Sequence, residues 1–412
     1  MKKYISVFLI LLCSCMTALA AEGKEATVEH KKPSMTQILR VKDGRLMAGS
    51  DEVVLNGVNL GGWLLMESWM SPISDPDETL AHTDILEILT QRFGRERARF
   101  LMKQYRDSFI TEADFSRIAD MGFNCVRIPF WYGDFMTETG EWHAASPTQN
   151  PGFQRLDWAI EQCKKNGLYA ILDMHGCPGG QSTNHSTGTI GKGQLYQKEV
   201  YQHAMEELWR AIAKRYRQNP VVAAYDVMNE PQNNKDFQGA GVYQAETPNA
   251  VAQTNYVHDR MIRAIRSVDS AHVISVEGIW SIRTLPHPKT YGWSNMMYQL
   301  HIYDSSIEQI NPKVDELLGA RDTMGVAVYV GEYNSGLFEE YAADLYQQYG
   351  ISRTKWTYKT VGRQDNWGLY NKPMEKTDIR TASYEEIKTS FNEQMLTENG
   401  FVFNQEEYKN IQ

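Results

Sequence analysis

Two stretches decide the fold: Val221-Val-Ala-Ala-Tyr-Asp-Val-Met-Asn229-Glu230-Pro231 and Val326-Ala-Val-Tyr-Val-Gly331-Glu332-Tyr333. Each is a short, apolar, β-rich run that stops at a glutamate. Carboxylates are seldom buried without a partner or a task, so a run that only packs would not be expected to end this way. Two such runs fit a barrel of parallel strands whose carboxyl ends converge on one cleft.

Further apolar runs of the same kind extend this pattern along the chain. Amphipathic stretches typical of helices lie between many of them, including 153–165, 202–217, 254–268 and 312–324. Alternation of strand and helix predicts a parallel α/β sheet, and eight units predict closure into a (β/α)8 TIM barrel. The eight runs cover residues 53–59, 123–129, 169–175, 221–229, 272–278, 296–303, 325–331 and 353–359.

The N-terminus has the features of an export signal. Lys2 and Lys3 precede an apolar stretch, and Ala18-Leu19-Ala20 forms a small-x-small cleavage site. We therefore expect a signal peptide over residues 1–20, a flexible lead-in over 21–37 and a single catalytic domain over 38–412. The protein is expected to be exported, to the periplasm or the extracellular space. Cys15 lies in a loose lipoprotein-like box, so a lipid-tethered form is the alternative.

Composition excludes several classes of partner. The 412 residues carry a formal net charge of −9 without a basic block, which argues against nucleic acid. No segment after the signal is apolar enough for a transmembrane helix. After cleavage an odd number of cysteines remains, Cys125, Cys163 and Cys177, without metal-ligand spacing, so neither a disulfide framework nor a metal is predicted. We expect no cofactor, and a monomer is favoured.

Several motifs resemble those of clan A retaining glycosidases, and specifically of glycoside hydrolase family 5 in its exo-β-1,3-glucanase branch. The first is Gly57-Val-Asn-Leu-Gly-Gly-Trp63-Leu64, and the second is Asn124-Cys-Val-Arg127-Ile-Pro129. The third, Leu172-Asp-Met-His175-Gly-Cys-Pro-Gly-Gly-Gln181, is similar to the Asp-Leu-His-Gly-x-Pro-Gly-x-Gln stretch at the third strand of that branch. His301-x-Tyr303 and Val330-Gly331-Glu332 follow in order, so the resemblance covers nearly the whole mature chain.

The resemblance implies a role for each matching residue. Glu332 would be the catalytic nucleophile, and Glu230 the general acid that later becomes the general base. Arg127 and Tyr303 would bind the nucleophile carboxylate, and Asn229 the 2-hydroxyl of the sugar. His175 and His301 would line the glycone subsite.

The eighth run matches less closely. Thr354-Lys-Trp356-Thr-Tyr358-Lys359 makes Trp356 the candidate platform under the innermost sugar, although Tyr358 replaces a second tryptophan of the branch. Trp63, Trp131 and Trp367 are alternatives that either stack on sugar or only pack. The loop over 176–193 is expected to wall the glycone side, and the loop over 233–249 the aglycone side.

The resemblance implies hydrolysis of β-linked glucan by double displacement, with exo action on β-1,3-glucan favoured. An endo-β-1,4-glucanase (cellulase) and a β-1,6-glucanase remain alternatives, because the glutamate motifs are shared across specificities. Two other classes remain open. A non-catalytic glycan-binding protein is disfavoured because both glutamates are present. A metal-dependent hydrolase would recruit Asp173, His175 and His301, but the chain has no His-x-His or His-Glu-x-x-His element.

Overall fold

The computed structural model describes residues 35–412, except 78, 234–246 and 279. The described residues belong to one compact unit, which runs over 32–412. The expected signal peptide over 1–20, Cys15 and nearly all of the lead-in over 21–37 lie outside the described residues. So does most of the predicted aglycone loop over 233–249.

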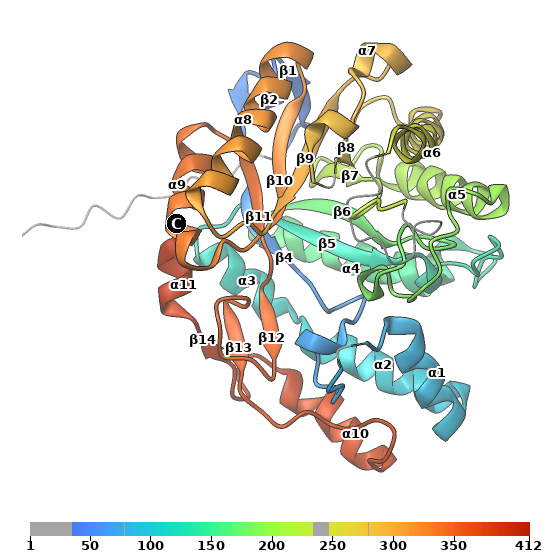
Figure 1. Cartoon of the computed structure of the whole chain (residues 1–412). Coiled ribbons are helices and arrows are strands. Elements are labelled where there is room, and N and C mark those ends of the chain that lie inside the picture. Colours follow the sequence, from blue (N-terminus) through green and yellow to red (C-terminus); the bar gives the residue numbers. More distant parts are fainter. Residues whose placement is uncertain (1–34, 78, 234–246, 279) are drawn as a thin grey trace, which may run out of the picture. The chain divides into compact units, whose positions relative to one another are not determined.

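Eight parallel strands form a closed barrel, which confirms the predicted (β/α)8 fold (Figure 1). Each predicted run supplies one strand. The first and last barrel strands close the ring, with Asn56 opposite Arg353. In chain order the strands are β4 (Asn56–Asn59), β5 (Cys125–Trp131), β6 (Tyr169–Gly176), β7 (Val222–Asp226), β8 (Val273–Glu277), β9 (Met296–Ile302), β10 (Ala327–Tyr333) and β11 (Ser352–Lys355).

Helices follow the strands and cover the outside of the barrel (Figure 1). Local signals fix their ends. The Asn150 side chain accepts hydrogen bonds from two backbone N–H groups of α4, and Gly167 ends that helix at φ +71°. The helices between barrel strands are α1 (His82–Phe93), α2 (Arg95–Phe109), α3 (Glu112–Asp120), α4 (Pro151–Asn166), α5 (Glu199–Tyr216), α6 (Pro248–Arg266), α7 (Pro288–Tyr291), α8 (Ile307–Met324) and α9 (Glu339–Gln348).

A small antiparallel sheet lies at the amino-terminal end of the barrel. It consists of β1 (Arg40–Lys42), β2 (Arg45–Ala48) and β3 (Asp51–Glu52). Leu39 and Leu46 form a buried cluster with residues near the start of the barrel strands, among them Cys125 and Tyr169. Apolar packing therefore fills this end, and the carboxyl ends of the strands are left for polar side chains.

A third sheet follows the last barrel strand. It contains β12 (Lys359–Val361), β13 (Tyr370–Lys372) and β14 (Val402–Phe403), accompanied by α10 (Tyr384–Phe391) and α11 (Gln405–Asn410). The connection from β12 to β13 brings Arg363 and Trp367 to the pocket described below. In the described part of the chain, no helix is long and apolar enough to span a bilayer. Cys125, Cys163 and Cys177 are buried and free.

Candidate active site

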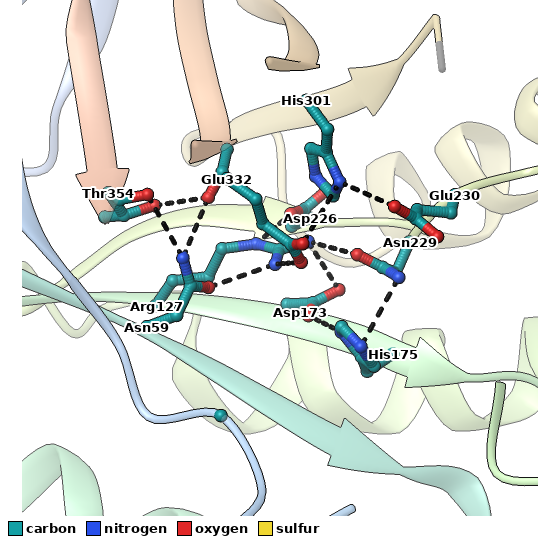
Figure 2. A network of polar contacts seen from close by, with 12 residues as sticks. Asn59, Arg127, Asp173, His175, Asp226, Asn229, Glu230, His301, Glu332 and Thr354 are labelled. Carbon is teal, nitrogen blue, oxygen red and sulfur yellow. Dashed lines mark hydrogen bonds and ion pairs between the residues drawn. The ribbon is translucent and has the colours of Figure 1, made fainter. Parts of the chain in front are cut away.

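The two glutamates singled out in the sequence meet at the carboxyl ends of the barrel strands (Figure 2). Glu332 lies in β10 and is 3% exposed. Glu230 lies four positions after the last residue of β7. One carboxylate oxygen of each glutamate and one ring nitrogen of His301 all lie within 4.8 Å of one another.

The segment that carries Glu230 continues the fourth barrel strand beyond its regular pairing. The Val227 N–H donates to the Ser275 carbonyl at 3.1 Å, and the Asn229 N–H donates to the Met174 carbonyl at 3.2 Å. The backbone then turns at Glu230, whose φ is +41°. Residues other than glycine seldom adopt this left-handed conformation, so the surrounding contacts must hold it.

The Glu332 carboxylate is held at both oxygens. Arg127 Nη1 donates to Oε1 at 2.7 Å. The Tyr303 hydroxyl donates to Oε2 at 2.6 Å. These two donors fix the direction in which the Glu332 carboxylate points.

Arg127 is fully buried and joins three carboxylates (Figure 2). Besides its bond to Glu332, its Nε donates to Asp226 Oδ2 at 2.8 Å and its Nη2 lies 3.1 Å from Asp173 Oδ1. Burial alone would lower the pKa of Arg127, but Asp173, Asp226 and Glu332 raise it well above its usual value. Arg127 therefore stays charged, as a buried cation with matched partners does.

The Glu230 carboxyl has a different environment. Its side chain is 16% exposed, and Oε1 lies 3.1 Å from His301 Nδ1. Burial raises the pKa of Glu230, and His175 only partly opposes that shift. Burial also lowers the pKa of His301 to about 3, so this ring is neutral at ordinary pH. A carboxyl with a raised pKa beside one bound by a guanidinium is the arrangement of an acid and a nucleophile.

A cavity of about 560 Å³ opens over these groups. Of the eight predicted site residues, six line the cavity: His175, Asn229, Glu230, Tyr303, Glu332 and Trp356. The other two, Arg127 and His301, are buried behind the glutamates. The structure thus places His301 in contact with both carboxylates and outside the residues that line the cavity, whereas the sequence predicted it in the lining of the glycone subsite.

Some of the candidate aromatic side chains line the cavity, and others are buried in the core. Trp356 lines the cavity and stacks on His175, with the rings 5.4 Å apart and 9° from parallel. Trp367 also lines it, together with Trp69 and Trp280. Trp63 is buried, and Tyr358 is buried with its hydroxyl donating to Asp114 at 2.9 Å. Trp131 contacts His82 edge-on at 4.9 Å and does not line this cavity.

Glu67 is a lining carboxylate that our interpretation of the sequence missed. It is 5% exposed, and its Oε2 accepts a hydrogen bond from Trp69 Nε1 at 3.0 Å. Burial alone would raise the pKa of Glu67, but the hydrogen bond and charge of His185 lower it. The signal was present, because Leu64-Leu-Met-Glu67 is again an apolar run that ends in a glutamate. The predicted glycone loop over 176–193 supplies Asn184, His185 and Ser186 to the same cavity.

The atoms of Glu230, His301 and Glu332 could in principle hold a metal ion. The donor set argues against this use. Glu332 accepts hydrogen bonds at both oxygens, one of them from a guanidinium 2.7 Å away that would repel a cation. The cluster is suited to moving a proton between carboxyl and substrate.

Two adjacent glutamates at the carboxyl ends of the fourth and seventh barrel strands are the arrangement of a barrel glycoside hydrolase. A family model described as cellulase (glycosyl hydrolase family 5) matches residues 90–362. This chain belongs to glycosyl hydrolase family 5, and it is a glycosyl hydrolase by that membership.

Curated relatives agree with this assignment. A β-xylosidase of Phanerodontia chrysosporium is 26% identical over 374 residues, which are 81% of this chain and 72% of the relative. A probable glucan 1,3-beta-glucosidase A of Neosartorya fischeri is 33% identical over 209 residues, 49% of this chain and 48% of the relative. One from Aspergillus niger is 35% identical over 178 residues, 43% of this chain and 41% of the relative. The chain thus spans less than half the length of these two glucosidases.

Solved structures share the fold. An endogalactoceramidase aligns with a TM-score of 0.58 at 19% identity and covers 79% of this chain and 75% of its own. A rutinosidase from Aspergillus niger aligns with a TM-score of 0.57 at 18% identity and covers 82% and 98%. These likenesses concern the barrel alone.

Proposed function

We propose that this protein is a retaining β-glycosidase of exo type that acts on β-linked glucan. The observation that carries the proposal is the approach of the Glu230 and Glu332 carboxylates to within 4.8 Å. Retaining enzymes place their two carboxyl groups about 5 to 5.5 Å apart, whereas inverting enzymes leave about 6.5 to 9.5 Å for a water molecule. The short separation supports double displacement.

In the first half-reaction, Glu332 attacks the anomeric carbon and forms a glycosyl ester. The glycosidic bond breaks as the proton on Glu230 passes to the leaving oxygen. In the second, Glu230 takes a proton from water, whose oxygen displaces Glu332 from the anomeric carbon. The raised pKa of Glu230 suits the first step. Once Glu332 is esterified its charge is gone, which lets Glu230 ionise and act as the base.

The other residues of the site position substrate and nucleophile. Arg127 and Tyr303 aim the Glu332 carboxylate through hydrogen bonds of 2.7 and 2.6 Å. Asn229, whose Oδ1 accepts from Arg127 Nη2 at 2.8 Å, is assigned to the sugar 2-hydroxyl. The stacked pair His175 and Trp356 is assigned to the innermost sugar.

The glucan linkage is proposed as β-1,3. The names of the fungal glucosidase relatives support it, as do the motifs around Gly57 and His175. Linkages β-1,6 and β-1,4 are the alternatives within the family. A β-xylosidase is the second candidate, because the relative of that name aligns over 81% of this chain.

The deciding experiment combines a substrate panel with stereochemistry. Purified protein is incubated with β-1,3-, β-1,6- and β-1,4-glucans and with an aryl β-xyloside, and released sugars are followed by size. Single glucose from β-1,3-glucan is expected, whereas a ladder of oligosaccharides would contradict exo action. Proton NMR of the first product should show the β-anomer; an α-anomer would contradict retention.

We also propose that the protein is exported, because glucan polymers occur outside the cell. Residues 1–20 have the charge and apolar pattern of a signal peptide, and Cys15 offers lipid attachment as the alternative. Mass spectrometry of the mature protein distinguishes a free N-terminus near Ala21 from an acylated Cys15.

A further inference from the structure

Another buried glutamate, Glu277, contacts the backbone of Glu230, and the proposed reaction gives it no task. Glu277 is the last residue of β8, the fifth barrel strand, and its side chain is fully buried. Within the described residues, its Oε1 has no hydrogen-bond partner. No arginine or lysine of the described chain forms an ion pair with it. Arg127, whose charge lowers the pKa of Glu277, is engaged with Asp173, Asp226 and Glu332.

The Glu277 carboxyl contacts the main chain of Glu230. The Glu230 backbone N–H donates to Glu277 Oε2 at 2.7 Å. This is the residue whose φ is +41°, a conformation that needs outside support. A hydrogen bond at this amide ties the strained residue to the neighbouring strand and so sets the direction in which its side chain leaves the backbone.

The same carboxyl also faces the histidine that contacts the Glu230 side chain. Glu277 Oε2 lies 3.5 Å from His301 Nε2, and His301 Nδ1 lies 3.1 Å from Glu230 Oε1. Glu277 therefore stands next to both the backbone and the side-chain support of Glu230. His301 also contacts the other glutamate of the pair: its Nδ1 lies 3.3 Å from Glu332 Oε2.

The charge of Glu277 follows from these surroundings. A carboxylate buried without a paired cation is costly, so the neutral acid is favoured. Burial raises the pKa of Glu277 well above its usual value, and the hydrogen bond from the Glu230 backbone N–H opposes that shift only in part. Arg127 lowers it and Asp226 raises it, so these two groups partly cancel. A neutral carboxyl still accepts the Glu230 N–H bond through one oxygen.

We propose that Glu277 is a positioning residue for Glu230: its buried carboxyl anchors the backbone of the acid/base and thereby aims the Glu230 carboxyl at the leaving oxygen. The inference rests on the proposed function of Glu230. The inference predicts that the loss of activity on replacing Glu277 increases with the need of the leaving group for a proton. A reaction with a leaving group that departs unaided should not depend on it.

The test uses purified full-length enzyme and two aryl β-glucosides, a phenyl glucoside that needs the acid and a dinitrophenyl glucoside that does not. For Glu277→Ala, we expect kcat/KM on the phenyl substrate to fall about tenfold to a hundredfold, as for a misplaced catalytic group. On the dinitrophenyl substrate it should stay within about threefold. Glu277→Gln keeps a neutral acceptor oxygen and should remain close to wild type on both substrates.

Ser275→Ala is the matched control. Ser275 lies in the same strand, and its Oγ accepts from Gln299 at 2.9 Å without contacting Glu230. This substitution should not change the ratio of kcat/KM on the phenyl substrate to kcat/KM on the dinitrophenyl substrate. Glu277→Asp is the second variant should the alanine variant not fold, because it retracts the oxygen while filling most of the space; it should lose activity selectively on the phenyl substrate.

Two outcomes would overturn the inference. Equal losses on both substrates would mean a general structural role, and a glutamine variant as impaired as alanine would mean that an ionised carboxylate is required. Wild-type enzyme without activity on any aryl β-glycoside contradicts the proposed function itself, which is a separate result.

Discussion

Arg127 and Glu332 are 205 residues apart in the chain, yet their side chains join in a buried ion pair of 2.7 Å. The pair links the second and seventh barrel strands across the interior. Asp173 and Asp226 complete the set around the same guanidinium (Figure 2). Glu332 is therefore one of three carboxylates that share a single buried cation, and its position depends on the packing of four strands.

Glu332→Ala should abolish turnover without unfolding the protein. The substitution removes the group that would form the glycosyl ester, so kcat should fall at least about a thousandfold. Turnover is measured on the preferred substrate of the panel, and folding by circular dichroism. A variant that keeps a tenth of wild-type activity would overturn the assignment of Glu332.

Glu230→Ala should be slow but rescuable. Without the acid/base, hydrolysis of the glycosyl ester loses its general base, which contributes about a hundredfold to ten-thousandfold. Azide needs no base and is small enough to enter the space left by the side chain. Added azide should restore turnover of a dinitrophenyl glycoside and yield a glycosyl azide of retained configuration. Azide without effect, or a product of inverted configuration, would contradict the role of Glu230.

Arg127→Met should destabilise the fold. It leaves Asp173, Asp226 and Glu332 in the barrel interior without their cation, at a cost of about 3 to 5 kcal/mol. Urea unfolding at neutral pH measures the loss. The control is Arg283→Met: the Arg283 side chain is 81% exposed in its pair with Glu316, and such pairs contribute at most about 1 kcal/mol. Equal effects of the two substitutions would contradict the central place of Arg127.

Trp356→Ala should weaken sugar binding. The indole lines the cavity and stacks on His175, so its loss removes the platform and loosens that histidine. We expect kcat/KM to fall about tenfold to a hundredfold, the scale of one lost aromatic contact and its neighbour. Trp142→Ala is the control, since Trp142 is 39% exposed and stacks on Phe153 away from the lining residues. An unchanged kcat/KM for Trp356→Ala would remove this residue from the site.

The contribution of three buried histidines to stability should fall as the pH falls below neutrality. Burial lowers the pKa of His82, His258 and His301 to about 3 from an ordinary 6.5. The unfolded chain therefore binds more protons between these two values. The stability from neutral burial is complete above pH 6.5 and is lost towards pH 3, at about 1.4 kcal/mol per pH unit for each histidine.

Urea unfolding of wild type and His258→Leu at pH 7 and pH 5 checks this slope. Neither ring nitrogen of His258 has a hydrogen-bond partner among the described residues, and the residue lies in α6. The variant should lose less stability between the two pH values than wild type does. An identical loss in both proteins would mean that His258 does not contribute.

The barrel could be predicted from the sequence because its signals are local. Each of the eight apolar runs supplies a strand, and the stretches expected to be helical form α4, α5, α6 and α8. The family motifs also predicted that the residues around Glu332 lie close together, because the carboxyl ends of the strands in a parallel barrel converge. Their catalytic roles stay predictions that the variants above test.

What the sequence did not predict depends on contacts between distant segments. Glu67 and Glu277 carry the same local signal as Glu230, an apolar run that ends in a glutamate. Only their contacts in the folded structure show that Glu67 lines the cavity and that Glu277 is bonded to the Glu230 backbone. His301 was expected in the pocket wall, and its position behind the carboxylates depends on side-chain direction, which periodicity does not give. Arg363 reaches the cavity from a sheet beyond the eighth strand that no motif indicated, and Trp367, an alternative stacking residue in the sequence, lies in the same connection.

The pairing of β4 with β11 has a consequence for how the enzyme folds. Asn56 and Arg353 must be side by side before the ring is closed, so almost the entire polypeptide has to be available first. Contacts between such distant segments form slowly, because the intervening chain must be ordered before they stabilise anything. Glu332 and Trp356 arrive only with that last part of the ring. A polypeptide cut short before residue 352 thus lacks the closing strand, and it is expected to be inert whatever portion of the fold it attains.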